Sequence, residues 1–162
     1  MKKKIILAVL IILWAFLIFS LSSQRATDSD RVSKGIAVKV IKAIDFNNSM
    51  SEKEVAETAA YLNFFVRKGA HFCAYAVLGV LIALLFREFA FSVRNSMVGA
   101  VALSGLYACT DEFHQTYIEG RSGEIRDVGI DTVGALFGVT VFFLLAAIIK
   151  KCKNKKKSAG KS

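Results

Sequence analysis

The chain has 162 residues, of which 54% are hydrophobic, and it carries a formal net charge of +9. This length suits one domain, and the apolar content is too high for an ordinary soluble domain of this size. Because long apolar runs alternate with charged segments, the composition indicates a membrane protein. The lysines are concentrated at the two ends of the chain, so we interpret them as anchors beside membrane helices and exclude a nucleic-acid-binding role.

Four apolar segments predict four membrane-spanning helices, at residues 5–21, 70–86, 97–114 and 128–149. The expected fold is therefore all-α, an integral membrane four-helix bundle that forms a single domain over residues 1–162. The first segment has an alternative interpretation as a signal peptide, because small residues at Ser20 and Ser22 follow its basic start and apolar run. Its length and the later spans favour an anchor that is retained.

Basic residues predict the orientation of these spans. With both termini in the cytoplasm, the inner side holds 12 Lys and Arg residues and one acid, whereas the outer side holds 10 basic and 12 acidic residues. Since cytoplasmic loops are enriched in Lys and Arg, we predict a multi-pass protein of the cell membrane with both termini inside. Residues 150–162 then form a basic cytoplasmic tail, and residues 22–69 and 111–127 are external.

The first external connection is predicted to contain two helical elements. An amphipathic helix is expected at residues 29–45, between spans 1 and 2, where it would rest on the membrane or pack over the bundle. Its apolar positions are Val32, Ile36, Val40 and Ile44. The segment Ser51-Glu52-Lys53-Glu54 then matches a capping box, which predicts the start of a helix that runs into the second span.

Polar residues gather where the four spans reach the outer boundary. A helix rises ~1.5 Å per residue, so about 20 residues counted from each cytoplasmic end cross ~30 Å, and every count arrives at polar residues. Bare carboxylates are costly at this depth, so we expect Asp111 and Asp131 to face the bundle interior and pair with bases. Asp127 and Asp131 share a helix face with Gly134 and Gly138, a G-x-x-x-G pair that permits close helix contact.

This outer cluster contains the side chains that binding or converting an anionic substrate requires. Its basic residues suit a phosphate or pyrophosphate group, and both histidines of the chain fall within it, where they suit proton transfer near neutral pH. The candidate catalytic residues are His71, Asp111, Glu112 and His114. The candidate substrate-binding residues are Ser23, Gln24, Lys68, Gln115, Arg121, Arg126, Asp127 and Asp131.

Motifs from this cluster follow one another in a fixed order along the chain. They are Ser22-Ser23-Gln24, Lys68-Gly69-Ala70-His71-Phe72, Asp111-Glu112-Phe113-His114-Gln115, Gly120-Arg121-Ser122, and Asp127 with Asp131-Thr132-Val133-Gly134-Ala135. The set resembles the VanZ-like family of bacterial membrane proteins over roughly Trp14 to Leu145. That resemblance implies a four-span cell-envelope protein, and namesake members are linked to teicoplanin resistance. Asp131 departs from the pattern, which often has Asn there, and adds a negative charge.

The resemblance implies a contribution to glycopeptide tolerance, and the residues of the cluster suggest an outer-face site that binds or acts on a lipid-linked envelope substrate, such as a cell-wall precursor, within the lipid bilayer. The alternative is a non-catalytic membrane module that recruits an envelope partner or alters the surface, with the polar cluster as a structural salt-bridge network. A proton-coupled transporter is a further alternative.

We predict no cofactor, although a divalent metal would find mixed nitrogen and oxygen ligands. These ligands are His71, His114, Asp111, Glu112, Asp127 and Asp131. Catalysis versus binding, and the oligomeric state, stay open.

Overall fold

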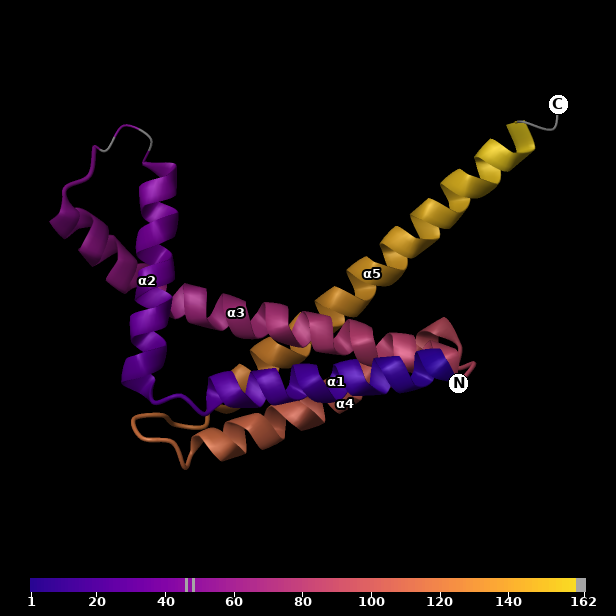
Figure 1. The fold of residues 1–162 in the computed structure, drawn as a ribbon, viewed down its shortest axis with the longest axis horizontal. Helices are drawn as coiled ribbons and strands as arrows, with labels where there is room; N and C mark the ends of the chain where they lie inside the picture. The colour runs from indigo at the N-terminus through magenta and orange to yellow at the C-terminus, as the bar shows by residue number, and fades with distance from the viewer. Residues whose placement is uncertain (46, 48, 160–162) are drawn as a thin grey trace.

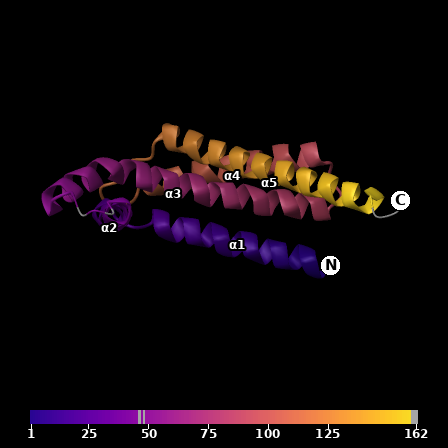
Figure 2. The same ribbon diagram turned by 90° about the horizontal axis from the view of Figure 1, so that it is seen from above.

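The computed structural model describes residues 1–45, 47 and 49–159, and within them the regular structure is entirely helical. The helices are α1 (Lys2–Ser22), α2 (Ala26–Ile44), α3 (Glu52–Glu88), α4 (Val93–Gln115) and α5 (Ile125–Ala159). Helices α1, α3 and α4 run alongside one another, α2 stands across the start of α3, and α5 leaves the group at an angle (Figure 1). Seen from above, α3 lies between α1 and α5 (Figure 2). The all-α prediction is confirmed for this part of the chain.

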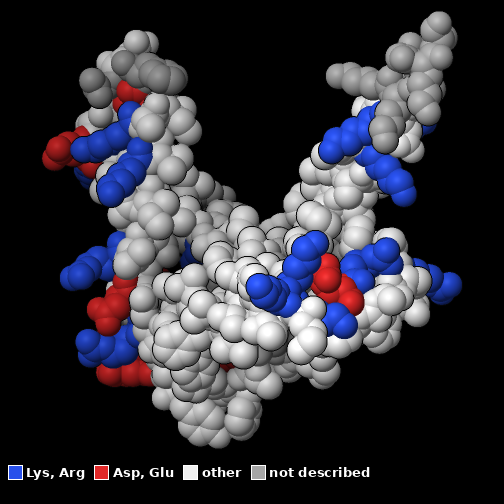
Figure 3. Space-filling view, turned by 45° about the vertical axis from the view of Figure 1, so that its right-hand side comes forward, with Lys and Arg blue, Asp and Glu red and all other residues white. Residues whose placement is uncertain are grey.

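Three of the described helices, α1, α3 and α5, are long and apolar enough to cross a membrane. On the face shown in Figure 3, one group of charged side chains lies along the left and another extends from the centre to the right, with largely uncharged surface between the two groups. Large apolar side chains such as Leu13, Phe137 and Leu144 are exposed on this bundle, which suits contact with lipid. These features indicate a membrane protein.

Helix α4, which contains the third predicted span, is not among the helices that meet the length and composition criteria for a span. Its buried face consists of small and polar residues, so its mean hydropathy is lower than that of the other three helices. These buried residues are Ser96, Ala100, Ser104, Ala108, Asp111, Glu112 and Gln115. The prediction of four spans is therefore supported by hydropathy for three of them. Of the predicted basic tail, residues 160–162 lie outside the described residues.

The amphipathic helix predicted at 29–45 is present as α2, but the face that packs on α3 differs from the apolar face in the prediction. Ser33, Ala37 and Ile41 are the buried residues, and the hydrophobic ones pack with Val55 and Ala59 near the start of α3. Apart from Ile41 these buried side chains are small, which allows the two helices to approach closely. The apolar residues of the predicted face, Val32, Ile36, Val40 and Ile44, are exposed.

The capping box at the start of α3 is confirmed. The Ser51 hydroxyl accepts a hydrogen bond from the Glu54 backbone N–H at 3.3 Å, and the Glu54 carboxylate accepts one from the Ser51 backbone N–H at 2.7 Å. These bonds to the carboxylate lower the pKa of Glu54. From this cap α3 continues for 37 residues, so the second predicted span, 70–86, is the C-terminal part of a longer helix.

Helices α3 and α5 pack closely at Gly134 and Gly138, as the glycine pair permits. A Cβ built at Gly134 would lie 2.5 Å from the backbone oxygen of Phe72, and one at Gly138 would lie 2.8 Å from the backbone carbonyl carbon of Ala76. Helix α1 joins from the other side of α3, where the Trp14 indole donates a hydrogen bond to the Ala74 carbonyl at 2.8 Å. This packing brings the C-terminal ends of α1 and α4 and the start of α5 to the middle of α3, where Lys68 and His71 lie.

Candidate functional site

The C-terminal end of α4 holds a buried chain of hydrogen bonds. Asp111 accepts a hydrogen bond from the hydroxyl of Ser22 on α1 at 2.8 Å. The Gln115 amide donates to the Glu112 carboxylate at 2.9 Å, and its oxygen accepts from Arg121 at 3.0 Å. The other Glu112 oxygen accepts from the Glu124 backbone N–H at 3.0 Å. One helix end therefore fixes α1 and the loop that leads into α5.

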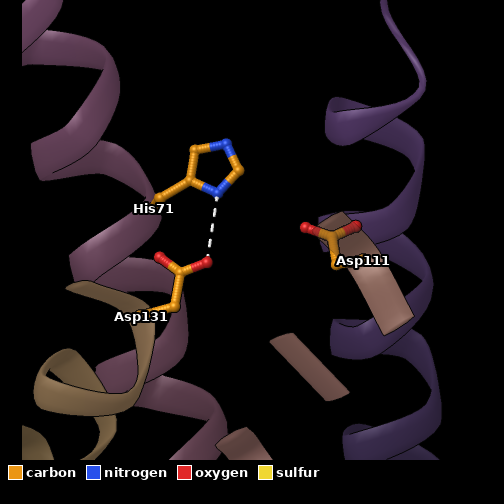
Figure 4. Close-up of side chains that lie close together, drawn as sticks. All are labelled: His71, Asp111 and Asp131. Atoms are coloured by element: carbon orange, nitrogen blue, oxygen red, sulfur yellow. Dashed lines mark ion pairs between the residues drawn. The ribbon is translucent and has the colours of Figure 1, made fainter. Parts of the chain in front are cut away.

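Helices α3 and α5 contribute two pairs of a basic and an acidic side chain beside this chain. Lys68 forms an ion pair with Asp127, and both side chains are largely buried. One turn further into each helix, His71 Nδ1 lies 3.7 Å from a carboxylate oxygen of Asp131. Asp111 reaches the same place from α4, as Figure 4 shows, and its carboxylate faces the other two side chains.

The expectation that Asp111 and Asp131 face the bundle interior is confirmed, since they are 2% and 1% exposed. Their expected pairing with bases holds for Asp131, which pairs with His71. For Asp111 the prediction is wrong within the described residues, because its close hydrogen-bond partner is the Ser22 hydroxyl. The Lys68 and Arg121 side chains pair elsewhere, which leaves no base within bonding distance of Asp111.

A cavity of about 90 Å³ opens beside these groups, and α3, α4, α5 and the loop between α4 and α5 all line it. We call it the polar pocket. It exceeds the space that a single water molecule needs. Its lining residues are Ala26, Arg67, Lys68, His71, Glu112, Gln115, Gly120, Arg121, Ser122, Glu124 and Asp127.

Arg121 is the cation lining the polar pocket that has no carboxylate partner among the described residues. Arg67 pairs with Asp30 at 2.8 Å and Lys68 pairs with Asp127, whereas Arg121 has no carboxylate partner within the described part of the chain. Its Nε is buried without a hydrogen-bond partner. Burial lowers the pKa of Arg121, and the nearby Arg67 charge lowers it further, although a guanidinium stays charged in proteins. An anion in the pocket would supply the missing partner.

The structure gathers most of the predicted site residues in or beside the polar pocket. These are Lys68, His71, Asp111, Glu112, Gln115, Arg121, Asp127 and Asp131. His114 is directed towards α1 instead, where its Nε2 lies 3.2 Å from the Ser23 hydroxyl and its ring stacks at 4.4 Å on Phe19. Gln24 is partly buried and does not line the pocket. Arg126 is exposed and pairs with Glu124 at 3.0 Å.

The sequence candidates omitted several residues of the site, among them Ser22, Arg67 and Glu124. Ser22 follows the buried Ile18 by four residues, so helical spacing alone places it on the buried face of α1. Arg67 lines the pocket, although its neighbour Lys68 was the predicted base. Glu124 takes part through its backbone N–H, which any residue supplies, so no sequence signal marks it.

The fold and site together define a membrane protein in which a helical bundle encloses a polar pocket at the ends of its helices. The sequence model of the VanZ/LLP1 family matches residues 7–146, which is most of the chain. The protein belongs to this family, as the ordered motifs implied. Searches of the curated proteins and of the solved structures returned no match.

Loss of the Ser22–Asp111 hydrogen bond is expected to lower the stability of the protein, and Ser20 on the same helix provides the control. Replacing Ser22 by alanine leaves Asp111 Oδ2 with only the Gln115 amide at 3.5 Å, and an unsatisfied buried acceptor costs about 1–3 kcal/mol. Ser20 is exposed and bonds to its own helix backbone, so Ser20→Ala should be nearly neutral. Thermal unfolding of the purified variants in detergent measures the difference. Equal unfolding midpoints for the two variants would show that this hydrogen bond does not stabilise the protein.

Proposed function

We propose that this protein crosses the cell membrane four times, with both termini in the cytoplasm and the polar pocket at the outer face. Helix α4 has 23 residues, which at ~1.5 Å each suffice to cross the ~30 Å hydrocarbon core. Its outward residues Val98, Leu103 and Leu106 are apolar and exposed, as lipid contact requires. Small and polar residues are tolerated on its inner face because they pack against the other helices.

The position of the N-terminal lysines supports this orientation. The Lys4 ammonium lies 4.0 Å from the centroid of the Phe89 ring, so the start of α1 and the connection between α3 and α4 lie at the same end of the bundle. That end carries Lys2, Lys3, Arg87 and Arg94 in addition. The polar pocket lies at the other end of α4, between the middle of α3 and the start of α5. The positive-inside rule therefore favours a cytoplasmic location for the lysines and an outer location for the pocket.

We propose further that the pocket holds the phosphate or pyrophosphate group of a lipid-linked envelope substrate. The observation that carries this proposal is the buried Arg121, whose Nε lacks a partner in a cavity that Arg67 and Lys68 also line. A guanidinium binds phosphate oxygens bidentately, and an apolar tail would lie among the lipid-facing helices. His71 lines the same cavity and suits proton transfer to a bound phosphate. At the level of the cell, we propose a contribution to teicoplanin-type glycopeptide tolerance.

A second candidate function is a non-catalytic module whose surface recruits an envelope partner. The exposed apolar stripe of α2, which contains Val32, Ile36, Val40 and Ile44, favours it. In that case the polar cluster serves to close the end of the bundle. Replacing Ile36 and Val40 by serine would then remove the cellular role, whereas a pocket variant would not.

Lipid analysis of cells tests the proposed function. Total lipids are extracted from cells that carry the gene, lack it, or express the Arg121→Gln variant, and are compared by mass spectrometry. The proposal predicts a change in a phosphorylated lipid or a lipid-linked cell-wall precursor on deletion, which the wild type restores and Arg121→Gln does not. Identical lipid profiles and identical teicoplanin tolerance with and without the gene would contradict it.

A further inference from the structure

We propose that His71, Asp111 and Asp131 form a binding site for one divalent transition-metal cation of the Zn²⁺ or Mn²⁺ type. Each residue comes from a different helix, α3, α4 and α5 respectively, and the three side chains converge in the bundle interior (Figure 4). The proposal does not rest on phosphate binding: His71 lines the polar pocket and is shared by the two proposals, but Arg121 takes no part in the metal site.

The distances between the three side chains suit a shared ion. One nitrogen of His71 and one oxygen from each carboxylate all lie within 4.8 Å of one another, and His71 Nδ1 is 3.7 Å from Asp131 Oδ2. Metal bonds to these atom types are about 2.0–2.2 Å long, so ligands on opposite sides of one ion lie about 4 Å apart. Small rotations of the three side chains would therefore place all three atoms around a single cation.

The carboxylates also lack the partners that buried negative oxygens need. Both oxygens of Asp131 and Oδ1 of Asp111 are buried without a hydrogen-bond partner, and the two residues are 1% and 2% exposed. The His71–Asp131 separation of 3.7 Å is too long for a hydrogen bond. Buried carboxylates normally carry a partner or bind a metal, and one imidazole cannot satisfy two of them.

Neighbouring groups do not fill this role. Lys68 pairs with Asp127, and Arg121 donates to Gln115, so among the described residues no Lys or Arg lies within ion-pair distance of Asp111 or Asp131. Ser22 and Gln115 donate only to Oδ2 of Asp111. The Tyr75 hydroxyl, one helical turn beyond His71, is also buried without a partner. An imidazole with two carboxylates suits Zn²⁺ or Mn²⁺ better than Mg²⁺ or Ca²⁺, which favour oxygen ligands alone.

Metal titration of the full chain tests the proposal. The protein is purified in detergent without a histidine tag, stripped with a chelator, and titrated with Zn²⁺ and separately with Mn²⁺ by calorimetry, with bound metal counted by elemental analysis. We expect about one ion per chain. Asp131→Asn preserves the size of the side chain and is expected to weaken binding at least tenfold, as is His71→Ala. Loss of even a supporting residue of a metal site typically costs ~10–100-fold in affinity.

A matched variant controls this titration. His114→Ala removes the other histidine, which lies against Ser23 and Phe19. It should keep one ion per chain. Thermal unfolding of each variant, with and without added metal, separates lost binding from lost folding, because only metal-binding proteins should show a higher midpoint with metal. Absence of stoichiometric metal in the wild type, or equal binding by Asp131→Asn and His114→Ala, would overturn the proposal.

A negative result for one of the two proposed sites does not contradict the other. Arg121→Gln should weaken binding of a phosphorylated lipid and leave the Zn²⁺ stoichiometry at one. Metal binding without any effect on envelope lipids would therefore support the metal site and contradict the proposed substrate. An effect on envelope lipids without metal binding would contradict the metal site alone.

Discussion

Gly138→Ala is expected to destabilise the helix bundle by about 1–3 kcal/mol or more, because a Cβ at this position meets backbone that cannot move aside. It would overlap the Ala76 carbonyl oxygen and lie 2.8 Å from that residue's carbonyl carbon and Cα. The α3–α5 contact must open to admit the methyl group. Thermal unfolding in detergent and the yield of folded protein measure the effect.

The matched control is Gly129→Ala on the same helix. A Cβ at Gly129 meets nothing within 4 Å, so alanine should be neutral or slightly stabilising, since it favours helix over glycine by up to about 1 kcal/mol. The two substitutions are chemically identical and are expected to have opposite signs. Equal shifts in the unfolding midpoint would show that α3 and α5 do not pack as described.

Arg121→Gln is expected to weaken binding of a phosphorylated lipid by roughly 10–150-fold, since hydrogen bonds to charged groups contribute about 1.5–3 kcal/mol. The expectation follows from the unpartnered Nε of Arg121 in the polar pocket. Glutamine retains a donor and similar polarity but lacks the charge. Binding of a polyprenyl phosphate in mixed micelles measures the affinity, and the inhibitory concentration of teicoplanin measures the cellular effect.

Arg126→Gln provides the comparison for Arg121. Arg126 lies five residues further along, is exposed, and pairs with Glu124 outside the pocket, so its loss should leave lipid binding within about twofold. Membrane abundance of each variant is measured in the same cells. Equal losses for the two arginines would indicate a general effect of surface charge, and a loss that follows protein abundance would indicate a structural role for Arg121.

Features that depend on short-range sequence patterns could be predicted. The capping box Ser51–Glu54 and the Gly134–Gly138 pair each depend on a few neighbouring residues in a helix, and the structure contains both. The helical phase also predicts that Asp131 points inward, because the same face carries the two glycines. Local spacing therefore predicts much of the end of the bundle where the site lies.

Features that depend on the choice between two helix faces could not be predicted. In α2 the bulky residues Val32 and Ile36 are exposed and small Ala37 is buried, because close approach to α3 depends on the shape of the partner helix. His114 shares an approximate face with Asp111, yet three residues correspond to about 300° of rotation, and its ring lies against Ser23 and Phe19 outside the polar pocket. Hydropathy also misses that α4 combines a polar buried face with an apolar exposed one.

The central claim is that separate helices bring their polar groups together on the outer side of the membrane. It is tested by single cysteines in a chain whose native Cys73, Cys109 and Cys152 are replaced by serine. Gly69→Cys on α3 and Ser122→Cys in the loop before α5 should react with a membrane-impermeant thiol reagent in intact cells. Glu88→Cys should react only after the cells are permeabilised. Labelling of residues 69 and 122 from opposite sides of the membrane, or of Glu88→Cys in intact cells, would contradict the account.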